Sequence, residues 1–140
     1  MKIPTSTSKE ESRTRTSNII MVDNEPDVNI TIKTALEEDG DFKVDTFNDA
    51  ESALFAFKSD HYDLAILDIR MPGTNGFQLC RKLREIDKKI KICFLTAVEL
   101  AYLQDIDSDI INELSTDCFV AKPVNTTDLI DRLKVILSQE

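Results

Sequence analysis

The sequence predicts a parallel β-sheet covered by helices on both faces. Short apolar runs alternate with segments of helical periodicity from Asn18 to the end of the chain, which is the pattern of an α/β protein. The 140 residues suffice for one domain with one core, and 41% of them are hydrophobic against 31% charged. Because no apolar run reaches the roughly 20 residues of a membrane span, we expect a soluble protein.

Five strands are predicted from apolar runs bounded by polar or turn-forming residues. They lie near residues 19–22, 43–47, 64–67, 92–95 and 118–121. These runs are nearly continuous in apolar character, as expected for strands that are buried on both faces.

The first two helices are predicted from apolar residues at helical spacing. The first lies between strands one and two and stops before Gly40. Its apolar stripe consists of Val28, Ile32 and Leu36. The second begins at Asn48, which resembles a capping box together with Glu51. Its stripe consists of Ala50, Ala53, Leu54 and Phe57.

Three more helices follow strands three, four and five. The third spans residues 76–86, and its apolar stripe consists of Leu79, Leu83 and Ile86. The fourth lies between Thr96 and Cys118, where acidic residues interrupt the stripe. That interrupted stripe consists of Ile106, Ile110 and Leu114. The fifth has Asn125 as its N-cap, with Asp128 at N3. Its stripe consists of Leu129, Leu133, Ile136 and Leu137.

The ends of the chain and its cysteines set the expected context. Residues 1–17 are polar and rich in Ser and Thr, which predicts a disordered extension without a secretory signal, followed by a domain at 18–140. The cysteines, Cys80, Cys93 and Cys118, form no CxxC pair. They favour buried thiols in a reducing cytoplasm over a disulfide framework.

The charge of the chain excludes several classes of function. Four of its 17 basic residues and two of its 26 acidic residues lie in residues 1–17. Residues 18–140 therefore contain 13 bases and 24 acids, which is a net charge of −11. Such a body repels nucleic acid and anionic membranes. A single histidine, His61, excludes a multi-histidine metal site, and we expect it on the surface. Three glycines are too few for a glycine-rich phosphate loop.

Polar residues follow four of the predicted strands. Asp23 follows the first, Asp68 the third, Thr96 the fourth and Lys122 the fifth. Ligands of an open parallel sheet bind beyond the carboxyl ends of its strands, so these side chains are expected to converge. Two carboxylates, a hydroxyl and an ammonium suit a phosphate and a hard divalent cation.

The order of these segments resembles the receiver domain of two-component response regulators. The resemblance rests on four segments. They are DNEP after strand one, which begins with an acidic residue, LDIRMPGTNG around the end of strand three, Thr-Ala after strand four and Lys-Pro after strand five. It covers residues 18–140 and implies a doubly wound, flavodoxin-like sheet of order 2-1-3-4-5 with five helices. It further implies that Asp68 accepts a phosphoryl group from a sensor histidine kinase, that Lys122 pairs with the phosphate, and that Thr96 and Phe119 form the switch.

The resemblance also implies a Mg²⁺ site. Its ligands would be Asp23, Asp68, the backbone carbonyl of Arg70 and, in place of the acid usual in the family, Asn24. An amide keeps an oxygen but lacks the charge, so weaker Mg²⁺ binding is expected. Asn24 is alternatively a helix N-cap.

Two neighbouring positions bear on the same site. Glu25 and Asp27 are candidates to supply the charge missing at Asn24, although Glu25 is equally a solvated residue of the first helical turn. Arg70 and Val98 occupy the positions that flank the hydrolytic water in the family. Neither is an evident base, so the phosphorylated state is not expected to be short-lived.

The leading hypothesis is a phosphorylation-controlled switch that changes a protein-binding surface near the fourth helix and strand five. It would assist its own phosphorylation and dephosphorylation without being an enzyme, and would act in a phosphorelay through a kinase and a downstream protein. A pseudo-receiver that binds constitutively is the alternative, because Asn24 weakens the metal site. A phosphohydrolase is disfavoured because position 70 is arginine and not an acid. Only Ser138-Gln139-Glu140 follow the last helix, so we expect a single-domain regulator or a fragment of a longer protein.

Overall fold

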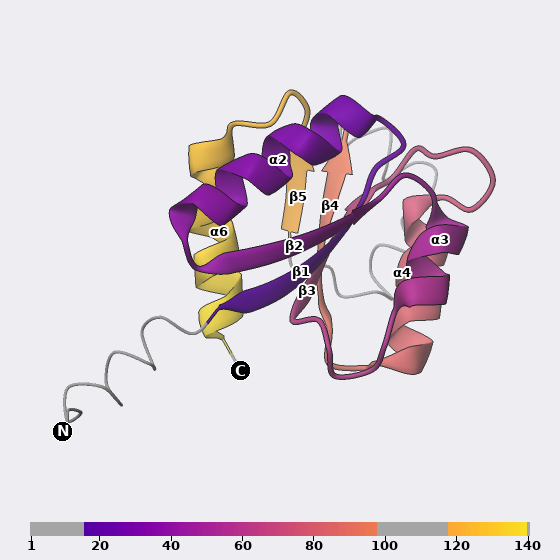
Figure 1. The fold of residues 1–140 in the computed structure, drawn as a ribbon. Coiled ribbons are helices and arrows are strands. Elements are labelled where there is room, and N and C mark those ends of the chain that lie inside the picture. Colours follow the sequence, from indigo (N-terminus) through magenta and orange to yellow (C-terminus); the bar gives the residue numbers. More distant parts are fainter. Residues whose placement is uncertain (1–15, 98–117, 140) are drawn as a thin grey trace, which may run out of the picture.

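The computed structural model describes residues 16–97 and 118–139 as a five-stranded sheet between two layers of helices (Figure 1). The strands are β1 (Ser17–Val22), β2 (Phe42–Phe47), β3 (Leu64–Asp68), β4 (Lys91–Thr96) and β5 (Cys118–Ala121). All neighbours pair in parallel, in the order β2-β1-β3-β4-β5. The predicted strands and their order are therefore confirmed, and β1 begins at Ser17, within the segment expected to be an extension.

The described helices lie on opposite faces of this sheet. Helices α2 (Pro26–Asp39) and α6 (Thr126–Ser138) cover one face, and α3 (Ala50–Ala56) and α4 (Gly76–Ile86) cover the other (Figure 1). Four of the five predicted helices are thus present. The helix predicted between strands four and five lies outside the described residues, as does Val98.

The sheet separates the core into two clusters because successive side chains of a strand point to opposite faces. Ile19 and Met21 of β1 pack with Leu36 of α2 in one cluster. Ile20 and Val22 belong to the other cluster, which contains residues of α3 and α4. All four β1 side chains have no exposed surface, as the continuous apolar run predicts.

Two predicted helix caps are wrong. The N-cap of α3 is Asp49, whose Oδ1 accepts a hydrogen bond from the Ser52 N–H at 2.7 Å. Asn48 is engaged elsewhere, since its Oδ1 accepts from Asn29 Nδ2 at 2.9 Å. The N-cap of α2 is Glu25 and not Asn24, because a proline follows Glu25 and suits the first helical position.

The other predicted helix ends are confirmed. Gly40 ends α2 with φ of 95°, a left-handed conformation that glycine adopts readily. Asn125 caps α6 by accepting a hydrogen bond from the Asp128 N–H at 2.9 Å. None of the helices within the described ranges is long and apolar enough to cross a membrane.

Candidate functional site

The sheet brings four of the predicted site residues to one edge. Asp23 directly follows β1, Asp68 ends β3, Thr96 ends β4 and Lys122 directly follows β5. Asp23, Asp68 and Thr96 are buried, with exposed fractions of 0%, 4% and 3%. Burial of two carboxylates is costly unless a cation compensates them, so the position of Lys122 decides the electrostatics of the site.

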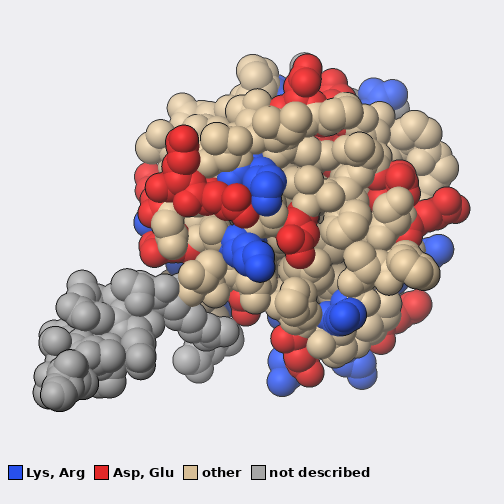
Figure 2. All heavy atoms as spheres, in the orientation of Figure 1, with Lys and Arg blue, Asp and Glu red and all other residues tan. Residues whose placement is uncertain are grey.

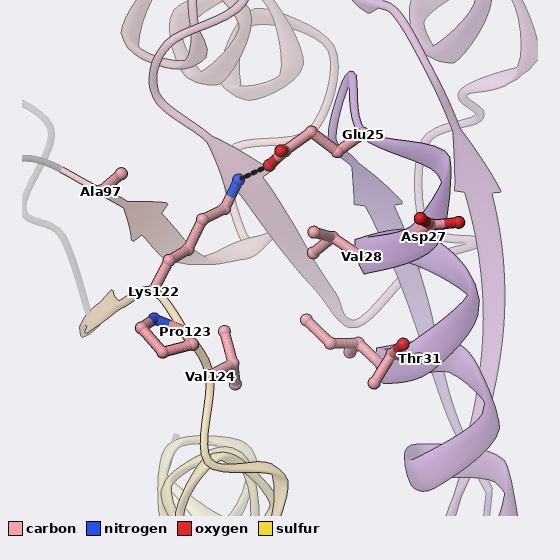
Figure 3. Close-up of a pocket in the computed structure, with 9 residues that line it drawn as sticks. Glu25, Asp27, Val28, Thr31, Ala97, Lys122, Pro123 and Val124 are labelled. Carbon is pink, nitrogen blue, oxygen red and sulfur yellow. Dashed lines mark hydrogen bonds and ion pairs between the residues drawn. The ribbon is translucent and has the colours of Figure 1, made fainter.

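Lys122 forms the centre of an acidic cluster. Its Nζ lies 2.8 Å from Asp23 Oδ2 and 3.6 Å from Asp68 Oδ2. A third carboxylate, that of Glu25, lies 2.8 Å away through Oε1, and Figure 3 shows the lysine extended toward it. Burial disfavours the charged form of Lys122, but its contacts with Asp23, Glu25 and Asp68 outweigh burial and raise its pKa. The ammonium is therefore fixed in its charged form beside Asp68.

The carboxyl group of Asp68 binds its proton more tightly than an ordinary aspartate. Burial, and then repulsion from Asp23, raises the pKa of Asp68 from its usual 3.8 to about 6. Lys122 and a hydrogen bond from the backbone of Arg70 act in the opposite direction. Asp68 is still mainly a carboxylate at neutral pH, so it can act as an oxygen nucleophile.

Asn29 fixes the loop after β1, a role that the sequence reasoning missed. Its Nδ2 donates to the carbonyl of Asp23 at 2.8 Å and to that of Phe47 at 3.2 Å. The side chain is buried, on the same helical stripe as Ile32 and Leu36. A polar residue on an otherwise apolar stripe was the available signal, because a buried amide needs partners.

Gly76, at the start of α4, lies against the backbone of Asp68. A Cβ at this position would collide with the Asp68 carbonyl oxygen and lie 2.9 Å from Ile69 Cα. The Gly76 N–H donates to the Ile69 carbonyl at 2.9 Å. The absence of a side chain thus lets α4 approach the end of β3, which holds Asp68 in place.

Thr96 and Phe119 lie on the neighbouring strands β4 and β5, which a backbone hydrogen bond and a ring contact link. The Thr96 carbonyl accepts a hydrogen bond from the Lys122 N–H at 2.9 Å, which aligns the ends of β4 and β5. Phe119 is half-buried and stacks on Phe94, with ring centroids 5.5 Å apart. Because Phe94 and Phe119 are partners across the two strands, a shift at the end of β4 would reach the Phe119 ring.

The residues around Asn24 differ in what they contact. Asn24 is exposed and lies next to the buried Asp23. Glu25, 60% exposed in its side chain, pairs with Lys122, so it is more than a solvated residue of the first turn. Asp27 extends from α2 away from Lys122 (Figure 3). Of the two candidates to supply charge, only Glu25 therefore contacts the cluster.

The oxygen donors of the site fit a hard divalent cation. Asp23 Oδ2 is fully buried, and its neighbour is the Lys122 ammonium at 2.8 Å. No three acidic, histidine or cysteine side chains form a cage within residues 16–97 and 118–139. Two carboxylates completed by backbone oxygen and water suit Mg²⁺, which keeps several waters and seldom has an all-protein cage.

A groove opens beside the cluster. It has a volume of about 540 Å³ and lies between the start of α2 and the segment after β5, with Lys122, Pro123 and Val124 on one wall (Figure 3). A ligand in this groove would reach the Lys122 ammonium from solvent. Elsewhere, on the face that Figure 2 shows, basic side chains lie among acidic ones.

Comparisons with known proteins agree on one family. The family model described as response regulator receiver domain matches residues 19–134. The transcriptional regulatory protein CseB of Streptomyces coelicolor is 30% identical over 121 residues, which are 86% of this chain and 49% of that protein. The chain thus spans about half the length of the curated relatives it matches.

Solved structures of the same kind share the fold. A CheY-like receiver domain protein from Methanospirillum hungatei has a TM-score of 0.77 and 25% identity, over 88% of this chain and 94% of that one. The response regulator TrrA from Thermotoga maritima, solved in complex with Mg²⁺-BeF, has a TM-score of 0.69 and 34% identity, over 86% of this chain and 98% of that one.

Proposed function

The chain belongs to the family of response regulator receiver domains, and from that premise we propose that Asp68 accepts a phosphoryl group from a sensor histidine kinase. The observation that carries this proposal is the pairing of a buried carboxylate, Asp68, with the Lys122 ammonium 3.6 Å away. Attack by a carboxylate on a phosphoryl group brings two anions together, and a fixed cation lowers the cost of that approach.

In the proposed transfer, a carboxylate oxygen of Asp68 attacks the phosphorus atom. The new P–O bond forms as the bond from phosphorus to the donor's imidazole nitrogen breaks, and the imidazole leaves with that electron pair. Lys122 offsets charge on the phosphoryl oxygens, and Thr96 donates its hydroxyl hydrogen to one of them. Gly76 and the backbone N–H of Arg70 keep Asp68 in position.

Receiver domains bind Mg²⁺ at the phosphorylation site, and we propose that this chain does so too. Asp23, Asp68 and the Arg70 carbonyl would hold the ion, with the Asn24 amide as a weaker ligand. The bound ion would supply charge neutralisation for the transferred phosphoryl group. The two buried carboxylates at the ends of β1 and β3, those of Asp23 and Asp68, support this assignment because Mg²⁺ prefers oxygen ligands.

Receiver domains are signalling switches, and we propose a specific path for the signal. Phosphate on Asp68 would draw the Thr96 hydroxyl inward, and Phe119 would follow through its stacking on Phe94. The surface that changes would include β5 and the helix that the sequence predicts between strands four and five, which lies outside the described residues, and a downstream protein would bind to this surface. Arg70 and Val98 offer no base for hydrolysis, which supports a phosphorylated state that is not short-lived. The proposed setting is cytoplasmic.

Intact mass spectrometry tests the phosphoacceptor directly. The full chain is incubated with acetyl phosphate, with and without Mg²⁺, and should gain about 80 Da once, only with the metal. Asp68→Asn should abolish the gain. The control Asp131→Asn, at an exposed position of α6, should retain it. A gain that persists in Asp68→Asn would contradict the proposal.

A second candidate function, a pseudo-receiver that binds a partner constitutively, is favoured by two observations at the site. The position after Asp23 carries an amide, and Lys122 already pairs with Asp23 and Glu25. If the cluster needs no metal, titration calorimetry should detect no Mg²⁺ binding, and acetyl phosphate should leave the mass unchanged. If the parent protein binds Mg²⁺ and the Asp23→Asn variant does not, the result would favour the phosphorylated switch.

A further inference from the structure

Two cysteine side chains lie next to each other on the face of the sheet that α2 and α6 cover. Cys93 of β4 and Cys118 of β5 are partners in the strand register. Their Sγ atoms lie 2.7 Å apart, and both side chains are buried. The residues are 25 positions apart in the sequence, so it is the register that brings them together.

We propose that Cys93 and Cys118 form a redox site, in which a hydroperoxide converts the two thiols to an intramolecular disulfide and a dithiol reductant restores them. This modification is distinct from phosphorylation and uses no residue of the Asp68 site. Disulfides of reducing compartments are usually transient and serve redox sensing or catalysis.

The backbone geometry permits the bond. Neighbouring strands lie about 4.8 Å apart, within the range of about 4.4–6.8 Å between Cα atoms that disulfides span. The sulfur atoms need to approach from 2.7 Å to about 2.05 Å.

Cys118 is the thiol that an oxidant would meet first. It lies on β5, one of the two edge strands of the sheet in the described part of the chain, and lines a cavity of about 360 Å³ together with Arg132 and Ile136. That volume exceeds what a few water molecules occupy, so a small peroxide fits. Cys93 has no exposed surface and is reached through Cys118.

Arg132 supplies the charge that makes Cys118 reactive. Its guanidinium donates a hydrogen bond to the Cys118 sulfur, the largest of the contacts that raise the pKa of Arg132. Nη1 also donates to the Phe119 carbonyl at 3.2 Å and Nε to Asp128 Oδ2 at 3.1 Å, which anchor the group. A cation beside a thiol favours the thiolate, which is the nucleophile in thiol oxidation.

The chemistry balances in two steps. The Cys118 thiolate attacks one peroxide oxygen, the O–O bond breaks, and hydroxide leaves, which gives a sulfenic acid. The Cys93 thiol then loses its proton and attacks the Cys118 sulfur, and the S–O bond breaks with release of water. Overall, the two thiols lose two electrons and two protons, and hydrogen peroxide becomes two molecules of water.

Mass spectrometry of the full chain under hydrogen peroxide tests the site. We expect a loss of about 2 Da, recovery with dithiothreitol, and a crosslink between the peptides that contain Cys93 and Cys118. The matched control is Cys80→Ser, because Cys80 is buried in the cluster on the other face of the sheet, and this variant should form the same crosslink. In Cys93→Ser, Cys118 should stop at a sulfenic acid that dimedone labels.

Arg132→Gln gives the test of reactivity. It should form the crosslink several-fold more slowly, because the cation that favours the thiolate is removed. A crosslink that involves Cys80, a disulfide between two chains, or oxidation of Cys118 to sulfinic acid without the loss of about 2 Da would overturn the proposal. An unchanged rate in Arg132→Gln would overturn the role of Arg132.

Discussion

Replacing Asp68 by asparagine should stabilise the metal-free protein at neutral pH. Asp68 is 4% exposed and lies near a second buried carboxylate, Asp23. Both circumstances disfavour its charge, and they raise its pKa from 3.8 to about 6. The asparagine side chain is of nearly the same size and does not ionise, so the substitution removes the charge and leaves the packing in place.

The expected magnitude follows from proton linkage. The folded state binds the Asp68 proton more tightly than the unfolded state does. Protonated Asp68 therefore contributes its full stabilisation below about pH 4, and this contribution to the free energy of unfolding is lost as the pH rises from about 4 to 6. A change in pKa from 3.8 to about 6 corresponds to about 3 kcal/mol at neutral pH. Since Lys122 loses one of three carboxylate contacts in the variant, we expect a net gain of about 1–3 kcal/mol.

Urea unfolding with a chelator present measures this difference. The free energy of unfolding of Asp68→Asn, minus that of the parent protein, should grow between pH 4 and pH 7. Asp131→Asn, on the exposed side of α6, should show no such growth. A difference that stays constant with pH, or an Asp68→Asn protein that is less stable at pH 7 than the parent, would refute this account of the site's electrostatics.

Three further substitutions probe the neighbours of Asp68. Asn24→Asp should tighten Mg²⁺ binding about tenfold in titration calorimetry, because a carboxylate replaces an amide; an unchanged affinity would mean that position 24 does not contact the ion. Glu25→Gln should change the free energy of urea unfolding by less than about 1 kcal/mol, since its pair with Lys122 is exposed and screened by solvent; a larger loss would show that solvent does not screen the pair. Gly76→Ala should destabilise the protein by about 1–3 kcal/mol in the same assay, because its Cβ meets the Asp68 backbone; a neutral effect would contradict that close approach.

Much of the fold could be predicted because buried parallel strands need apolar runs that few other elements show. The prediction for 118–121 matches β5, and that for 76–86 matches α4. The helix starts were harder, because several polar residues stand before each helix and only one of them caps it. Asn48 and Asn24 are good caps by type, yet Asp49 and Glu25 occupy those positions.

The site was predictable where topology alone places it. Parallel strands bring their carboxyl ends to one edge, so Asp68 and Lys122 could be assigned together from their positions after strands. The pair of Lys122 with Glu25 joins residues 97 positions apart, and the contact of Cys93 with Cys118 depends on the register of β4 and β5. Neither follows from local patterns, because both require knowing which side chains of separate elements face each other.

Amide chemical shifts measured with a phosphoryl mimic test the central claim most directly, namely that charge added at Asp68 is transmitted through Thr96. Beryllium fluoride with Mg²⁺, added to the full chain, should shift the amides of Asp68, Thr96, Phe119 and Lys122. In Thr96→Ala, the shifts at Asp68 and Lys122 should remain and that at Phe119 should disappear, because the hydroxyl that links the phosphoryl group to β4 is absent. Identical shifts at Phe119 in both proteins, or no shifts in the parent protein, would contradict the account.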